Sequence, residues 1–223
     1  MFSQAILCID TACNLMCLGC STYYLNSEIQ FFGNSKAKLI NIVGGEVFFS
    51  SKYLNKIKQL KADGKKIRLW TNLLVDEQQL KLALPYVDDW VIYFPISSAG
   101  FYRRLTGVDA FSRLKKNIQV LKSLNASCFL HMPVATQTID FVPYVHEFSR
   151  ENLLHLILTY QNETLNKEQI SYLKRFNKVS SVYLFKNKKT SHSLCSVFPF
   201  SIIFDPLQWG INLFFELLPG YLR

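Results

Sequence analysis

The sequence has little of what marks several classes of protein. Among 223 residues there are only 9 glycines and 7 prolines, and no apolar heptad repeat is sustained. These shortages exclude collagen-like, low-complexity and coiled-coil chains. The apolar runs near the C-terminus, at residues 197–204 and 211–218, are shorter than the roughly 18 to 20 residues of a transmembrane helix.

Cysteines and targeting signals are also scarce. Six cysteines are too few for a small disulfide-bonded scaffold of this length. The first apolar run, at residues 5–9, is short and has no basic flank, so it does not read as a signal peptide. A reducing cytoplasm is therefore the expected location, and clustered cysteines in that setting usually bind metal.

The sequence does contain a basic excess on an ordinary globular composition. Hydrophobic residues make up 49% of the chain, enough for a sizeable core. The net charge of +9 could hold nucleic acid or an anionic membrane, but it is also common on enzymes that bind neither. Helical spacing distributes the densest basic segment around a solvated face, and no RNA-binding aromatic motif accompanies it, so nucleic-acid binding stays open but is not favoured. The segment contains Lys52, Lys56, Lys58, Lys61, Lys65, Lys66 and Arg68.

Short apolar segments rich in β-branched or aromatic residues alternate with more polar, helix-patterned segments. Their starts lie about 20 to 40 residues apart, the size of successive βα units. The fold class is therefore α/β, with a parallel sheet covered by helices, either doubly wound or a partial (β/α) barrel. In both, the reactive site belongs at the carboxyl ends of the strands. We expect strands at residues 4–9, 38–43, 66–70, 90–94, 128–132, 153–158 and 181–185.

Two of the intervening segments have clear amphipathic spacing, with apolar residues on one helical face and basic residues on the other. Helix ends are expected at residues 63–64 and 84–85, where Asp-Gly and Leu-Pro occur. The two apolar faces comprise Leu54, Ile57 and Leu60 in the first segment, and Phe111, Leu114, Ile118 and Leu121 in the second.

A C-x₃-C-x₂-C motif follows directly after the first expected strand. It consists of Cys13, Cys17 and Cys20. Thiolates grouped in one short loop suit zinc or an iron–sulfur cluster, and the spacing favours the cluster, because structural zinc wants a second ligand pair that does not follow. The second expected strand leads into Gly44-Gly45-Glu46, so both motifs belong at the same edge of the sheet.

These motifs resemble those of the radical S-adenosylmethionine (radical SAM) superfamily, over roughly residues 4–185. The matching features are the cysteine loop, the GGE motif after the second strand, Thr71-Asn72 at the end of the third, and the stretch 102–107 before a helix. The resemblance implies a partial (β/α)₆ barrel of parallel strands over residues 1–189. Residues 190–223 would form an apolar C-terminal extension that caps the barrel, with interfacial membrane contact through this segment as the alternative.

The resemblance also implies a cofactor set and an activity. Cys13, Cys17 and Cys20 would ligate a [4Fe–4S] cluster whose fourth iron binds S-adenosylmethionine (SAM). The GGE motif (Gly44, Gly45 and Glu46) would bind SAM, the glycines because a side chain would block the close approach of the backbone. Thr71 and Asn72 would lie near SAM or the substrate. An external electron donor would drive reductive cleavage of SAM, and hydrogen would be abstracted from an unidentified peptide, RNA or metabolite.

Several alternatives stay open at this point. Gly19 stands where the family usually has an aromatic residue, and residues 93–96 after the fourth strand are mostly apolar. These departures motivate a second hypothesis, a non-catalytic cluster-binding relative that acts as a redox or interaction module. A zinc-stabilised interaction module is a third, but it leaves the GGE motif unexplained. Glu46 could instead be structural and tie its loop to a neighbouring strand, and His131 could face the cavity or be a hydrogen-bonded structural residue.

Overall fold

A single sheet organises the part of the chain that the computed structural model describes, which is residues 4–9, 12–17, 30–33, 36–49, 52–161, 165–176 and 182–187. The strand order is β2-β1-β3-β4-β5-β6-β7-β8. The strands are β1 (Gln4–Cys8), β2 (Gln30–Gly33), β3 (Leu39–Val43), β4 (Lys66–Thr71), β5 (Asp89–Tyr93), β6 (Ser127–Val134), β7 (His155–Gln161) and β8 (Val182–Asn187).

Every strand expected from the sequence is present, and from β1 through β3 to β8 each pairs in parallel with the next along the chain. The sheet is open, with β2 and β8 at its two edges. From β1 through β3 to β8 the strand order follows the chain without the reversal of a doubly wound sheet, so of the two α/β architectures the partial barrel is confirmed. The sequence pattern did not indicate β2, which pairs antiparallel with β1. Its four residues are too short a run to show a period, and no turn signature marks it as a hairpin partner.

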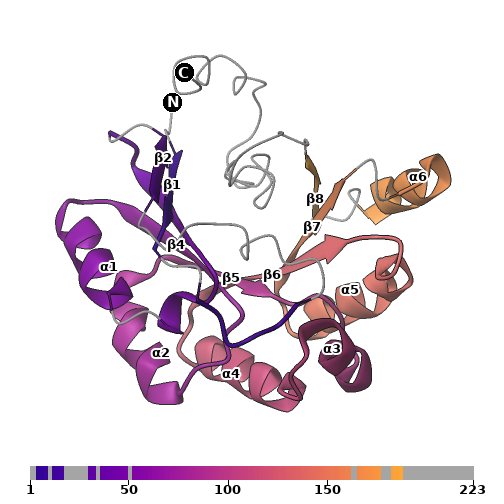
Figure 1. The fold of residues 1–223 in the computed structure, drawn as a ribbon, viewed down its shortest axis with the longest axis horizontal. Coiled ribbons are helices and arrows are strands. Elements are labelled where there is room, and N and C mark those ends of the chain that lie inside the picture. The colour runs from indigo at the N-terminus through magenta and orange to yellow at the C-terminus, as the bar shows by residue number, and fades with distance from the viewer. Residues whose placement is uncertain are drawn as a thin grey trace.

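The helices lie on the outer side of the curved sheet (Figure 1). Short 3₁₀ helices accompany them, and none of the helices in the described residues is long and apolar enough to cross a membrane. The α-helices are α1 (Tyr53–Ala62), α2 (Glu77–Ala83), α3 (Ala99–Thr106), α4 (Phe111–Ser123), α5 (Val142–Glu151) and α6 (Lys167–Phe176). The 3₁₀ helices are η2 (Val47–Phe49), η3 (Leu84–Tyr86) and η4 (Ile139–Phe141).

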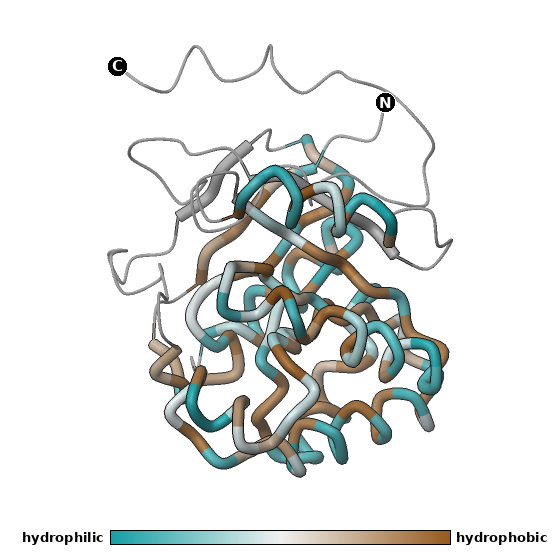
Figure 2. Tube along the Cα trace, turned by 90° about the vertical axis from the view of Figure 1, so that its right-hand side faces the viewer, coloured by the Kyte–Doolittle hydropathy of each residue, from teal (hydrophilic) through white to brown (hydrophobic). Residues whose placement is uncertain are grey.

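The expected apolar helix faces form part of the core. All four residues named for α4 are buried, and hydrophobic and hydrophilic residues alternate along the helices (Figure 2). In α1, Ile57 and Leu60 are buried, but Tyr53 takes the buried position at the start of the helix while Leu54 is only partly covered. Helices α1 and α2 end at Ala62 and Ala83, next to the Asp-Gly and Leu-Pro pairs that predicted their ends.

Strand residues alternate between the helix-facing core and the concave face of the sheet. Leu69 and Leu130 belong to the helix-facing core, so their neighbours Arg68, Trp70 and His131 face the concave side. Its place in the basic segment predicted that Arg68 lies on a solvated face, and this prediction is wrong. Its guanidinium donates to Asp89 Oδ2 at 2.8 Å, and its side chain is only 4% exposed.

The side chain of Asn117 in α4 holds the loop after β4 by hydrogen bonds to its backbone. Asn117 is buried, and its Nδ2 donates to the carbonyl oxygens of Leu73 at 2.8 Å and Val75 at 2.9 Å. Leu73 has a φ of 61°, a left-handed conformation that is costly for a non-glycine residue. The two hydrogen bonds therefore stabilise a strained turn directly after Thr71 and Asn72.

We predict that Asn117→Ala lowers the free energy of unfolding by about 2 to 4 kcal/mol, because two buried carbonyl groups lose their donor. Gln119→Ala, on the exposed side of the same helix, should change it by less than about 0.5 kcal/mol. Urea denaturation of both variants tests this, and equal effects would contradict the role given to Asn117.

Candidate functional site

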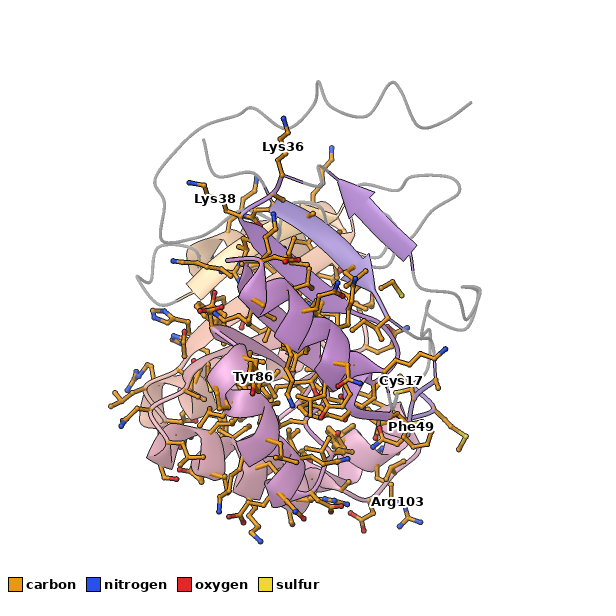
Figure 3. The ribbon with its side chains drawn as sticks, turned by 90° about the vertical axis from the view of Figure 1, so that its left-hand side faces the viewer. Cys17, Lys36, Lys38, Phe49, Tyr86 and Arg103 are labelled. Atoms are coloured by element: carbon orange, nitrogen blue, oxygen red, sulfur yellow. The ribbon has the colours of Figure 1, made fainter. Side chains whose placement is uncertain are left out.

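Three of the motifs singled out in the sequence meet at the carboxyl ends of β1, β3 and β4. The backbone N–H of Glu46 donates to the carbonyl oxygen of Ala12 at 2.8 Å, which joins the GGE loop directly to the cysteine loop. In the view of Figure 3, Cys17 and Phe49 lie toward this end, while Lys36 and Lys38, which precede β3, lie at the opposite end. The expectation that the cysteine loop and the GGE motif share one edge of the sheet is confirmed.

The Glu46 carboxylate ties the GGE loop to the end of β4. Oε1 accepts hydrogen bonds from Thr71 Oγ1 at 2.8 Å and from the Phe48 N–H at 3.3 Å, and Oε2 accepts from the Asn72 N–H at 2.7 Å. The side chain is 1% exposed. Burial raises the pKa of Glu46 to about 7, although these hydrogen bonds favour the charged form. The structure therefore shows the structural role expected for Glu46, in which its side chain ties the GGE loop to the neighbouring strand β4.

Asn72 continues this network to the cysteines. Its Nδ2 lies 2.8 Å from Asn14 Oδ1 and 3.6 Å from Cys13 Sγ, and its Oδ1 accepts from the Leu74 N–H at 2.9 Å. Asn14 in turn donates to the Leu74 carbonyl at 3.1 Å. The motifs predicted that Asn72 lies near the cofactor or substrate, but they did not indicate Asn14, although it stands inside the cysteine motif. A polar amide in a ligand loop was the available signal.

The surroundings of Cys13 and Cys17 suit metal-bound thiolates. Both residues are half-buried and pack against the core. Cys13 Sγ accepts from the Leu15 N–H at 3.4 Å as well as from Asn72, and N–H donors of this kind stabilise the charge of a coordinated sulfur. Cys20 and Gly19 lie outside the described residues, as does the whole of 190–223. Within the described residues, no group of three or more potential ligands is assembled. The donor set that can be seen fits an iron–sulfur cluster.

Helix α3 supports the cysteine loop through the stretch 102–107. The Met16 N–H donates to the Thr106 carbonyl at 2.9 Å. Gly107 ends the helix with a φ of 75°, and a Cβ added there would lie 3.3 Å from Met16 Cβ. The glycine is therefore needed both for a left-handed turn and for the close approach of the loop.

The concave wall beside this network is aromatic. The His131 ring packs edge-on against Trp70, with centroids 5.2 Å apart, and lies 6.4 Å from Tyr93. His131 Nε2 is hydrogen-bonded to Thr159 Oγ1 at 3.0 Å. Burial lowers the pKa of His131 to about 3, so the ring is neutral near pH 7. His131 therefore faces the concave side and is also hydrogen-bonded there, so both features expected of it occur together.

The apolar residues after β5 belong to the core. Phe94 and Ile96 are fully buried, and the Phe94 ring stacks on Phe148 with centroids 4.7 Å apart. They face the helices and not the concave side, where polar contacts to a ligand would be made. Tyr93, which precedes them, is only partly buried and lies beside His131.

Comparison with known proteins identifies the fold. No protein-family model matches the sequence, and no curated protein matches it. Among solved structures, Streptococcus suis SuiB bound to S-adenosylmethionine superposes with a TM-score of 0.62 and 13% identity, over 82% of this chain and 47% of SuiB. anSMEcpe with bound AdoMet and Kp18Cys peptide gives a TM-score of 0.59 and 15% identity, over 80% of this chain and 63% of that one.

A shorter structure matches along nearly its whole length. A domain of pyruvate-formate lyase-activating enzyme from Bacteroides vulgatus ATCC 8482 gives a TM-score of 0.56 and 13% identity, over 66% of this chain and 98% of the domain. All three are radical SAM enzymes, so the chain has the fold of radical SAM enzymes, as the motifs predicted. It spans about half the length of SuiB.

We predict that Gly107→Ala is more destabilising than Gly64→Ala. Both glycines have left-handed φ values, 75° and 73°, so each substitution carries a backbone cost of about 1 to 2 kcal/mol. A Cβ at position 64 meets nothing within 4 Å, whereas one at position 107 meets Met16. The overpacking should add about 1 kcal/mol or more at Gly107, measured as free energy of unfolding in urea. Equal losses would show that Met16 does not press on the helix end.

A pH-dependent contribution to stability is expected from Glu46. Its pKa is raised from 4.5 to about 7 in the folded protein, so the folded state holds this proton more tightly than the unfolded state. The contribution is fully present below pH 4.5 and is lost as the pH rises to about 7, by about 3 kcal/mol. Glu46→Gln should abolish this part of the pH profile of the unfolding free energy. Parallel profiles for the two proteins would refute the assignment.

Proposed function

We propose that this chain is a radical SAM enzyme that acts on a peptide or peptide-like substrate. The observation that carries the proposal is the hydrogen-bonded network from Ala12 through Glu46 to Asn72 and Cys13. It joins the cysteine loop, the GGE motif and the end of β4 at one edge of a radical SAM fold. Separate structural roles for these motifs would not require them to contact one another.

In this proposal Cys13, Cys17 and Cys20 hold a [4Fe–4S] cluster, and the half-buried thiols of the first two support it. Bound there, such a cluster supplies the one-electron reduction that splits SAM and starts hydrogen abstraction from the substrate, with the electron coming from an external donor. Gly44 and Gly45 leave room for the backbone to approach the methionyl end of SAM. Glu46 holds Thr71 and Asn72 at the end of β4, and in this proposal they contact SAM or the substrate.

The protein's own groups hold the loop, orient the ligand and limit the access of water. Asn72 and the Leu15 N–H direct donors at Cys13, and Glu46 keeps Asn72 in place. The aromatic wall of Trp70 and His131 lines the concave side with groups that are neutral near pH 7. A low-polarity wall of this kind suits radical chemistry, because it offers few groups that react with the intermediate.

The substrate class rests on two supports. The fold neighbour anSMEcpe was solved with bound AdoMet and a peptide, and the sheet of this chain is open between β2 and β8. An open sheet can admit an extended macromolecular segment more easily than a closed barrel can. RNA and small metabolites are the competing substrates.

A second candidate function is favoured by Phe94 and Ile96, which follow β5 and are fully buried. These two positions therefore offer no polar side chain to a ligand. In this alternative the chain binds the cluster as a redox or interaction module and does not cleave SAM. Isothermal titration of cluster-loaded protein with SAM separates the two: heat of binding supports the enzyme, and its absence supports the module.

We predict that anaerobically reconstituted protein binds about four iron and four sulfide per chain and forms 5′-deoxyadenosine with SAM and dithionite. Substitution of Cys13, Cys17 or Cys20 by Ala should reduce both readouts to background. The matched control is Cys128→Ala, because burial raises the pKa of the Cys128 thiol to about 12 and keeps it out of metal chemistry. A loaded cluster without 5′-deoxyadenosine would reject the enzymatic proposal.

A further inference from the structure

A hollow of about 220 Å³ lies beside the cysteine loop, bounded by η2, the loop after β4 and residues of α2 and α4. The helices cover the outer side of the sheet, so this hollow is separate from the concave side where SAM and substrate are proposed to bind. Its volume is below the roughly 300 to 1,000 Å³ of small-molecule clefts. It suits a single side chain of a docking protein, because interface anchors bind in small, well-packed pockets.

The wall of the hollow leads directly to a cluster ligand. Asn14 lines it, and Asn14 Oδ1 lies 2.8 Å from Asn72 Nδ2. The same Asn72 nitrogen lies 3.6 Å from Cys13 Sγ. Two hydrogen bonds therefore connect a surface hollow to the sulfur of a proposed iron ligand.

Apolar side chains form the floor and one edge of this surface. Phe48, Leu74 and Val75 line the hollow and are buried, whereas Phe49 lines it and is 62% exposed. Met16, two residues beyond Asn14 in the cysteine loop, is 66% exposed. Large apolar side chains left in solvent around a hollow are typical of a protein–protein contact surface.

Helix α3 brings a positive charge to the edge of this surface. Its last turn supports the cysteine loop, because the Thr106 carbonyl accepts the Met16 N–H at 2.9 Å. Arg103, one turn earlier, is exposed, and in the view of Figure 3 it lies on the same side of the molecule as Cys17 and Phe49.

Basic residues outnumber acidic ones around the hollow. Asp76 Oδ1 lies 2.6 Å from Nη2 of Arg113, which lines the hollow, and Glu77 Oε1 lies 2.8 Å from Lys81 Nζ. Asp109 lies between α3 and α4, and neither of these helices contains an acidic residue. A partner that docks here should therefore be acidic. The basic residues of the two helices are Arg103, Arg104, Arg113, Lys115, Lys116 and Lys122.

We propose that this hollow and its basic edge are the docking site of an acidic one-electron carrier protein. The inference rests on the proposed function, which requires an external electron donor. The reduced carrier loses one electron and the cluster at Cys13 gains it, while no bond forms or breaks and no proton moves. Docking at the hollow places the carrier where Asn14 and Asn72 lead to the Cys13 sulfur.

The first test is isothermal titration of the full chain without its cluster, since the docking surface belongs to the polypeptide. The probe is an oxidised, acidic plant-type [2Fe–2S] ferredoxin. Binding should weaken as salt is added, because salt screens the opposite charges. Arg103→Glu should weaken binding about tenfold at low salt and reduce the salt dependence. Phe49→Ser should weaken it about tenfold with the salt dependence unchanged, because it removes an apolar contact.

The second test measures how fast the cluster-loaded protein is reduced. Arg103→Glu and Phe49→Ser should each slow reduction by reduced ferredoxin about tenfold at low carrier concentration. Neither should slow reduction by reduced methyl viologen, a small cation that needs no docking surface. Slower reduction by both reductants would show damage to the cluster and overturn the docking role.

The matched controls are a charge reversal and an apolar-to-polar change at the other end of the sheet. Lys36→Glu changes an exposed lysine that lies at the opposite end in Figure 3. Leu153→Ser changes a leucine that is 92% exposed just before β7. Both proteins should bind ferredoxin as the unsubstituted chain does.

Binding that weakens in Arg103→Glu and Phe49→Ser but not in the controls supports the inference. Absence of binding by the unsubstituted chain overturns it, and so does equal weakening in Lys36→Glu, which would show a general attraction to the net charge of +9. In either case the proposed function stands if SAM and dithionite still yield 5′-deoxyadenosine. Failure to assemble any cluster removes the proposed function itself, whereas the titrations of the cluster-free chain still decide whether the docking surface exists.

Discussion

The arrangement of the site depends on one buried carboxylate. Glu46 has no counter-charge among its hydrogen-bond partners, and it satisfies both of its oxygens with a hydroxyl and two backbone N–H groups. Those donors belong to the end of β4 and to η2. Because an ionised group at this depth is costly unless every acceptor is satisfied, the carboxylate holds its neighbours in one geometry. Its own N–H then fixes the cysteine loop through Ala12.

Much of this could be anticipated from the sequence because the signals are local. Runs of β-branched and aromatic residues predicted every parallel strand, and the position of Cys13 and Glu46 just after two of them predicted that their loops would meet. The chain has no more than 15% identity to the structural neighbours described, yet the spacing of a few residues was sufficient to indicate the fold. Motif spacing reports strand ends, and strand ends of a parallel sheet share one edge.

What the sequence did not predict depends on contacts between distant residues. Asn117 occupies a position that reads as one more polar residue of an amphipathic helix, and only the strained turn at Leu73 explains its burial. Strand β2 carries no periodic signal in four residues, and it is recognisable only by its pairing with β1. The role of Gly107 at the end of a helix could be predicted locally, because helices commonly end at a glycine. Its close contact with Met16 could not be predicted, because no local pattern indicates it.

The pairing of Arg68 with Asp89 has a consequence for the amino ends of the central strands. The guanidinium also lies over the Phe129 ring at 5.8 Å, and Ser127 donates to Asp89 at 2.9 Å, so these side chains form a floor across the amino ends of β4, β5 and β6. Because Arg68 is buried and its carboxylate partner is only partly exposed, loss of either side chain would leave an uncompensated charge at this end of the sheet, so the pair can be replaced only together.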